Sequence, residues 1–133
     1  MPTEAFDIYT TIFKNGTGTF MARIVGADGT PVDRSAIASI HYSVYQLNDA
    51  DPNARQAMTG HENILLNMPE VLFDALQTDA VWTYDRVGYN FRHELDVSTN
   101  VAFPMAGCHY LVEYSLRPLV GQPILVRFRV HVI

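Results

Sequence analysis

The sequence predicts an all-β protein, a two-sheet antiparallel sandwich of about seven strands with one short helix near residues 69–76. Three observations lead there. Apolar and polar residues alternate along the C-terminal third, turn dipeptides separate short segments rich in β-branched and aromatic residues, and no repeat or low-complexity stretch interrupts the chain. The 133 residues fit one domain (1–133), and a hydrophobic content of 48% is enough for a sizeable core.

The final hairpin has the clearest pattern. Apolar side chains occupy every second position from Tyr110 to Leu116 and again from Ile124 to Val132. A period of two is typical of strands that are buried on one face. The loop Pro118–Pro123 is short, so we expect the two strands to pair antiparallel.

Three strands are expected in the first third of the chain. Residues 7–13 form the first, and a turn at Asn15-Gly16 leads into the second, at residues 19–25. Asp28-Gly29 then ends that strand as a turn dipeptide. The β-branched and aromatic run at 37–47 is expected to be a central strand.

The middle of the chain predicts two shorter strands, at residues 63–66 and 89–95, and the one departure from β structure. The segment 67–76 begins with Asn67 as a capping candidate, carries Pro69 near the first helical position, and repeats apolar residues at a spacing of four. These features predict a helix of about two turns that crosses from one sheet to the other.

Strands with continuous apolar faces must bury them against a second layer, so a sandwich is favoured over an open sheet. An immunoglobulin-like arrangement suits about seven short strands, with a closed barrel as the alternative. The expected core is Phe20, Ile24, Ile40, Tyr42, Val44, Tyr110, Val112, Tyr114, Val126, Phe128 and Val130.

Composition excludes several partners. The net charge is −5 and the nine basic residues are scattered, so we expect no nucleic-acid partner. No run reaches the ~20 apolar residues of a membrane helix, and the acidic N-terminal segment is not a secretory signal, so we expect cytosolic synthesis and no membrane partner. Charged residues make up only 17%, against seven Tyr, seven Phe and one Trp, which favours an oligomer or assembly subunit.

Neither histidine nor acidic residues form a complete metal-site motif. The five histidines lack HxH or HxxxH spacing, although His109 and His131 could approach each other on the outside of the final hairpin. Asp49, Asp51 and Asn53 have the opening spacing of a calcium loop, but the turn glycine and the closing glutamate of that loop are missing. We therefore expect no metal and no cofactor, and an exposed loop at 48–53.

No catalytic residues are expected either. Gly16-Thr17-Gly18 lacks the lysine of a phosphate-binding loop, and no serine lies in a nucleophile elbow. Cys108 is the single cysteine, so the chain has no internal disulfide. Its neighbour His109 would point to the opposite face of a strand and therefore would not activate the Cys108 thiol. The chain is expected not to be an enzyme.

The first strand is the candidate interface. Ile8 lies on its aliphatic face and Tyr9 and Phe13 on its aromatic face, and one core can cover only one of the two. Arg127 and Arg129 lie on the polar face of the last strand, where they either pair with Glu113 and water or form salt bridges between subunits.

Several segments form a familiar set of strand and turn motifs: Gly18–Val25, Ala27–Asp33, Ile40–Tyr45, Phe103-Pro104 through Gly107, Tyr110, Val112, Glu113, Gly121-Gln122-Pro123 and Val126–Val130. Together they resemble the short immunoglobulin-like proteins encoded among the head and tail genes of tailed phages and prophage-like clusters. The opening is similar to the N-terminal domain of the phage baseplate upper protein.

This resemblance implies a non-enzymatic virion subunit (capsid decoration, neck, tail or baseplate) that is made in the host cytoplasm and assembles with copies of itself or with other virion proteins. The alternative is a carbohydrate- or cell-surface-binding module that uses Trp82, Tyr84 and Tyr89 as a stacking platform.

Overall fold

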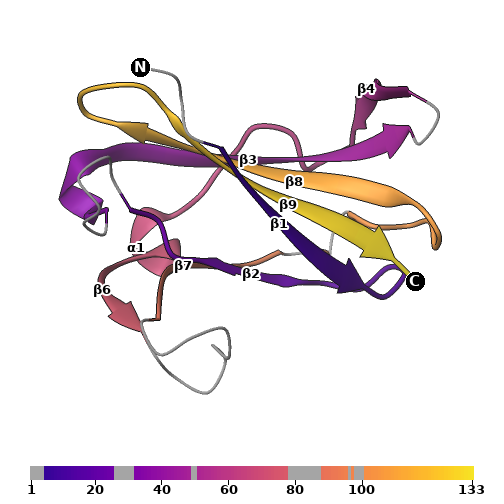
Figure 1. Cartoon of the computed structure of the whole chain (residues 1–133), viewed down its shortest axis with the longest axis horizontal. Helices are drawn as coiled ribbons and strands as arrows, with labels where there is room; N and C mark the ends of the chain where they lie inside the picture. The colour runs from indigo at the N-terminus through magenta and orange to yellow at the C-terminus, as the bar shows by residue number, and fades with distance from the viewer. Residues whose placement is uncertain (1–4, 26–31, 49–50, 78–87, 96, 98–100) are drawn as a thin grey trace.

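The computed structural model describes residues 5–25, 32–48, 51–77, 88–95, 97 and 101–133. These residues form two β-sheets packed face to face, with the larger sheet across the upper part of Figure 1 and the smaller sheet below it. The fold is therefore the all-β sandwich that the sequence predicts. The predicted turn at Asp28-Gly29 lies outside the described residues.

The larger sheet has the order β1-β9-β8-β3-β4, and β5 pairs with β3 beside β4. Its strands are β1 (Ala5–Ile12), β3 (Ile37–Asn48), β4 (Asp51–Ala57), β5 (Ile64–Leu65), β8 (His109–Pro118) and β9 (Ile124–Val132). The predicted final hairpin is confirmed, with β8 and β9 antiparallel and Tyr114 opposite Val126.

The smaller sheet has the order β2-β7-β6, with strands β2 (Thr19–Ala22), β6 (Leu72–Gln77) and β7 (Tyr89–Glu94). Two short helical segments complete the described elements, the 3-10 turn η1 (Arg34–Ala36) and the single turn α1 (Met68–Val71). No helix in the described ranges has the length and apolar character needed to cross a membrane.

The strand order is that of an immunoglobulin-like sandwich. The second, sixth and seventh strands form one sheet, and the hairpin β8–β9 lies between the first and third strands in the other. Every pairing in the described residues is antiparallel except one, because β1 runs parallel to β9 from Ala5 opposite Leu125 to Ile12 opposite Val132.

The turn at Asn15-Gly16 connects the two sheets rather than two paired strands. The backbone N–H of Gly16 donates to the carbonyl of Phe13 (2.8 Å), and Asn15 adopts a left-handed φ of 58°, which asparagine tolerates. β1 then lies against β9 while β2 lies against β7. The turn is thus at the predicted place, but it is not a hairpin turn.

The predicted helix at 69–76 is wrong over most of its length. α1 ends at Val71, and residues from Leu72 onward form β6, with Leu72 opposite Phe91 in β7. Leu72 is fully buried, so pairing with β7 and packing in the core outweigh the weak helical pattern. The predicted crossing is confirmed, since α1 connects β5 of the larger sheet to β6 of the smaller.

The segment expected to be an exposed loop also contributes a strand. Asp51 and Asn53 lie in β4, whose Arg55 is opposite Leu47 of β3. Asp49 lies outside the described residues. The Asp- and Asn-rich composition concealed this strand.

All eleven residues predicted for the core are buried. Tyr114 is at the centre of an aromatic cluster between the sheets, with its ring centroid 4.7 Å from that of Phe91 and 5.7 Å from that of Phe128. Phe20 lies 4.9 Å from Phe128 in an edge-to-face arrangement. This cluster connects the sheets where antibody domains have a disulfide.

Asn90 is a fully buried polar residue that the strand pattern had placed on the outside of β7. Its side-chain carbonyl accepts a hydrogen bond from the backbone N–H of Ile24 (2.7 Å), and its amide donates to the carbonyl of Ile24 (2.9 Å). The side chain therefore satisfies the backbone beyond Ala22, where β2 ends three residues before the predicted limit at Val25.

Candidate functional site

The outer face of the larger sheet carries a row of polar side chains. Alternation along each strand sends Tyr42, Tyr114 and Phe128 into the core, and leaves their neighbours on the other face. The register places Ser43 opposite Glu113 and Glu113 opposite Arg127. One row of polar residues thus crosses three strands.

Glu113 is the centre of this row. Its Oε2 atom accepts a hydrogen bond from Nε of Arg127 at 3.1 Å, and lies 4.0 Å from a guanidinium nitrogen of Arg55 in β4. The same guanidinium lies over the ring of Tyr45, 4.2 Å from its centroid. Of the two interpretations left open for Arg127, the structure contains the pairing with Glu113.

A half-open polar groove of about 290 Å³ lies beside Glu113 on this face. Two serines on adjacent strands line it, together with larger side chains and two residues of the turn before β5. Its lining residues are His41, Ser43, Tyr45, Glu62, Asn63, Glu113, Ser115 and Arg117. The Nδ1 atom of His41 is buried and has no hydrogen-bond partner among the described residues. The groove can hold a small polar molecule.

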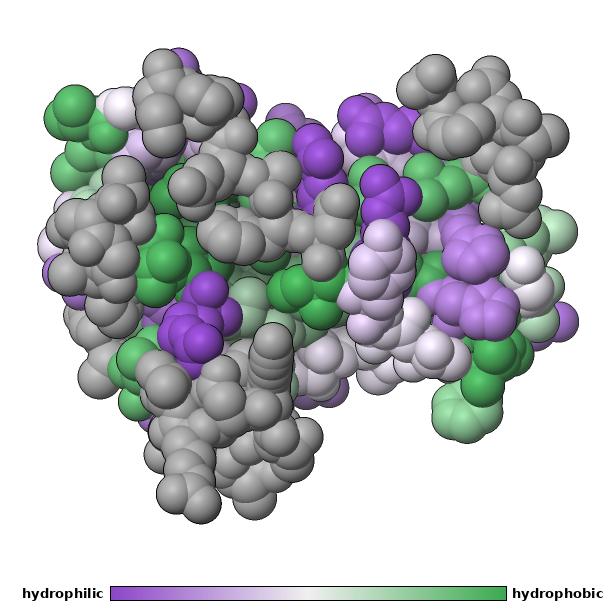
Figure 2. Space-filling model, viewed as in Figure 1, coloured by the Kyte–Doolittle hydropathy of each residue, from purple (hydrophilic) through white to green (hydrophobic). Residues whose placement is uncertain are grey.

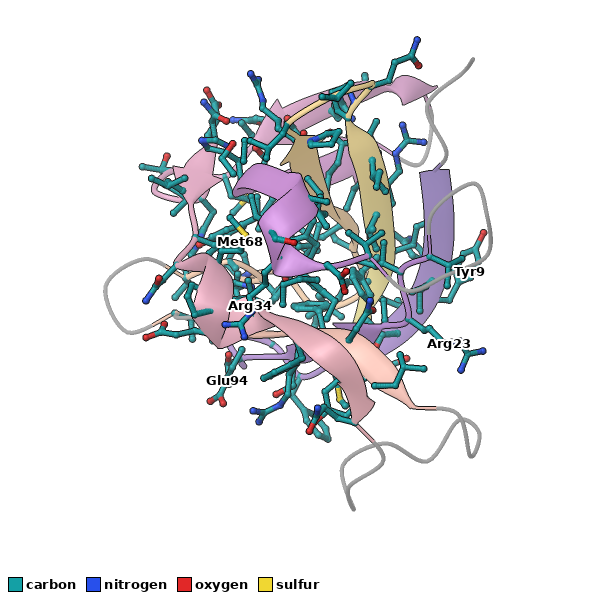
Figure 3. All side chains as sticks on the ribbon, turned by 90° about the vertical axis from the view of Figure 1, so that its left-hand side faces the viewer. Tyr9, Arg23, Arg34, Met68 and Glu94 are labelled. Atoms are coloured by element: carbon teal, nitrogen blue, oxygen red, sulfur yellow. The ribbon has the colours of Figure 1, made fainter. Side chains whose placement is uncertain are left out.

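β1 is an edge strand, as its position at the end of the sheet order shows. Its aliphatic face is turned inward, with Ile12 buried and Ile8 packed against the core. Its aromatic face is turned outward, with Tyr9 76% exposed and Phe13, just after the strand, 73% exposed. Figure 3 shows Tyr9 projecting away from the sandwich beside β1.

The two arginines and Ile8 of the predicted interface are less accessible than its aromatic residues. Arg129 lies opposite Tyr9 in the β1–β9 register and is half-buried, as is Arg127. Arg23 donates to the carbonyl of Gly88 (3.3 Å), although much of its side chain points outward in Figure 3. Tyr9 and Phe13 are therefore the accessible part of the predicted set.

Phe13 belongs to a second apolar surface at one end of the sandwich, where Met105 is 52% and Ile133 51% exposed. Backbone hydrogen bonds hold the three segments together, from Lys14 N–H to the carbonyl of Ile133 (2.9 Å) and from Asn15 N–H to that of Phe103 (2.8 Å). Figure 2 shows apolar side chains at the end of the molecule where the C-terminus lies. Phe13, Met105 and Ile133 are called the end patch below, a surface that strand periodicity did not reveal.

His109 and His131 face each other across β8 and β9, as their positions on the hairpin suggested. Their ring centroids are 4.9 Å apart and the ring planes differ by 20°. No group of three or more potential metal-ligating residues occurs in the described ranges. Cys108 is half-buried, with the side-chain amide of Gln46 3.9 Å from its sulfur.

The other histidines lie deeper. The Tyr42 hydroxyl is 2.8 Å from Nδ1 of buried His61, and the Tyr114 hydroxyl is 2.8 Å from Nδ1 of His93. Burial, with a smaller effect of His61, lowers the pKa of His93 to about 4. These pairs satisfy tyrosine hydroxyls inside the core.

Of the three aromatic residues expected to form a stacking platform for carbohydrate, the structure describes Tyr89. Tyr89 is 2% exposed and packs against Phe73, so it cannot offer its ring face to a ligand. Trp82 and Tyr84 lie outside the described residues.

No family model, curated protein or solved structure matches this chain.

Proposed function

We propose that this chain is a non-enzymatic structural subunit of a phage particle, as a capsid decoration, neck, tail or baseplate component. It is made in the host cytoplasm and acts by assembling with copies of itself or with other virion proteins. The observation that carries the proposal is the edge strand β1, which exposes Tyr9 and is followed by exposed Phe13.

An exposed sheet edge offers backbone N–H and C=O groups to a neighbouring strand. Natural proteins protect such edges with charge, proline or bulges. β1 contains one charged residue, Asp7, and no proline, and its eight residues pair with β9 without a register shift. A neighbouring subunit can therefore extend the sheet at β1 while its side chains cover Tyr9.

The end patch supports the same role. Phe13 directly follows the edge strand and also belongs to the end patch, so exposed aromatic and aliphatic side chains occur both along the edge and at its end. Aromatic residues and methionine are enriched in protein interfaces, whereas a monomer gains nothing from exposing them together.

The test replaces both aromatic residues with aspartate. Tyr9→Asp together with Phe13→Asp is expected to abolish self-association or incorporation into particles, measured by light scattering over a range of concentrations and by co-purification with particles. Circular dichroism should be unchanged, because both side chains are exposed.

The matched control is Leu119→Asp with Val120→Asp, two apolar residues in the β8–β9 loop with exposures of 68% and 91%. This variant should assemble like the wild type. If the Tyr9/Phe13 variant assembles normally, β1 is not the interface. The genes beside the coding sequence are an independent check, since portal, capsid or tail genes are expected there.

The second candidate is a carbohydrate-binding module, and the polar groove is the observation that favours it. Carboxylates, serines and an asparagine can bind vicinal hydroxyls, and Tyr45 supplies an aromatic wall. Titration with neutral hexoses, followed by NMR, should then shift the signals of Ser43 and Ser115. Ser115→Phe places a ring in the groove and should remove those shifts, whereas Thr11→Phe on β1 should not.

A further inference from the structure

His109 and His131 occupy a special position in the β8–β9 ladder. The backbone N–H of Val132 donates to the carbonyl of Cys108 (3.1 Å), which makes Cys108 and Val132 a hydrogen-bonded position. Such positions alternate along an antiparallel ladder. The directly opposed His109 and His131 therefore form a non-hydrogen-bonded pair, in which opposite side chains approach most closely.

The scaffold holds the two imidazoles in place. β9 lies between β8 and β1, and Thr11 of β1 is opposite His131 on the far side. The neighbouring residues Tyr110, Val130 and Val132 are fully buried, which fixes the backbone on both strands. Both histidines are themselves exposed.

Two imidazoles at this separation suit one class of ligand. Zn²⁺, Ni²⁺ and Cu²⁺ favour imidazole nitrogen, whereas Mg²⁺ and Ca²⁺ require several oxygen ligands. The ring centroids lie 4.9 Å apart in a stacked arrangement, and rotation about the side-chain bonds out of this stack can direct one nitrogen of each ring at a shared ion about 2 Å away.

We propose that His109 and His131 together bind an exchangeable divalent transition-metal ion through two imidazole nitrogens. The described residues provide no third ligand close by, so water or a donor from another molecule fills the remaining coordination positions. The site is independent of the proposed assembly role, because binding requires only the two strands of one chain.

The experiment uses the untagged full-length chain and adds Cu²⁺, Ni²⁺ or Zn²⁺ alone. Isothermal titration should give one ion per chain, or one ion shared by two chains, with Cu²⁺ bound most tightly. Electron paramagnetic resonance of the Cu²⁺ form should show two coordinated nitrogens. Affinity should fall as the pH is lowered, since protons compete for the same nitrogens.

Each of His109→Ala and His131→Ala should lower the affinity at least about tenfold, and the double variant should lose little more than either single one. Both side chains are exposed, so the metal-free variants should have the same melting temperature as the metal-free wild type. His41→Ala, which removes a histidine from the other end of the outer face, is the matched control and should bind like the wild type. The proposal is overturned if either single variant keeps wild-type affinity, if His41→Ala loses as much, or if Cu²⁺ shows one nitrogen only.

Discussion

The Nδ1 atom of His93 lies 2.8 Å from the hydroxyl of Tyr114, in a contact that joins β7 of the smaller sheet to β8 of the larger. Burial raises the pKa of Tyr114 well above its usual value and lowers that of His93 to about 4. Both groups are therefore neutral at pH 7, and the contact is a neutral hydrogen bond inside the aromatic cluster.

This contact predicts acid sensitivity. The pKa of His93 is about 4 in the folded chain, against 6.5 for the unfolded one, so the unfolded chain binds more protons between these values. The stability that His93 contributes should be complete above pH 6.5, fall as the pH drops toward 4 and be lost below. This loss amounts to about 3 kcal/mol, and urea unfolding at a series of pH values measures it.

His93→Gln separates titration from hydrogen bonding, because glutamine keeps a polar contact to Tyr114 without gaining a charge. The variant should lose stability less steeply between pH 6.5 and 4 than the wild type. Equal slopes for wild type and His93→Gln would show that His93 is not the acid-sensitive group.

Truncation of the aromatic cluster should be costly. Phe128→Ala or Tyr114→Ala removes a ring that is in contact with other rings in both sheets, and should cost about 3–5 kcal/mol in the free energy of unfolding. The exposed aromatic Phe13, changed to alanine, should cost less than about 0.5 kcal/mol. Losses below about 1 kcal/mol at both core positions would contradict the packing described here.

Asn90→Ala should destabilise the connection between β2 and β7. The change leaves the backbone N–H of Ile24 without its buried acceptor and removes one of the two hydrogen bonds that the Ile24 carbonyl accepts, the other coming from Val32 N–H, which should cost about 1–3 kcal/mol. Asn67→Ala is the matched control, since Asn67 is exposed and its side chain makes no capping hydrogen bond to α1. Chemical denaturation compares the two, and similar effects would argue against a special role for Asn90.

Gly18 has no room for a side chain. A Cβ atom there would lie 2.5 Å from Cδ1 of Ile12 and 3.2 Å from the ring of Phe20. Gly18→Ala should therefore cost about 1–3 kcal/mol. Ile12→Val removes the clashing methyl group, so the double variant should be more stable than the sum of the single effects predicts, as a double-mutant cycle can measure. Strict additivity would rule out this clash.

Periodicity predicted the parts of the fold that depend on one face being buried. The β8–β9 hairpin and the core follow from the alternation around Tyr114 and Phe128, and the aromatic outer face of β1 follows from Tyr9. The parallel pairing of β1 with β9 could not be predicted, because the residues at 5–12 and 124–132 are far apart in sequence and no local turn links them.

The errors have local causes. Pro69 and the apolar spacing after it imitate the start of a helix, but Leu72 is more stable in a strand against Phe91. Asn90 looks like a surface residue in an alternating strand, and its burial depends on the backbone of Ile24, which no pattern encodes. In the candidate site, Tyr9 and Phe13 could be predicted from the strand pattern, whereas the end patch and the polar groove required the three-dimensional arrangement.

The parallel pairing of β1 and β9 also determines how the domain responds to mechanical force. Ala5 and Val132 lie at opposite ends of the same two-strand ladder, about 23 Å apart along the strands. A pull that draws the two ends of the chain apart therefore loads the hydrogen bonds between these strands in shear. All of them must fail together, whereas a hairpin pulled from its open end unzips one bond at a time. A load applied at the start of β1 and the end of β9 is therefore resisted by the whole ladder at once.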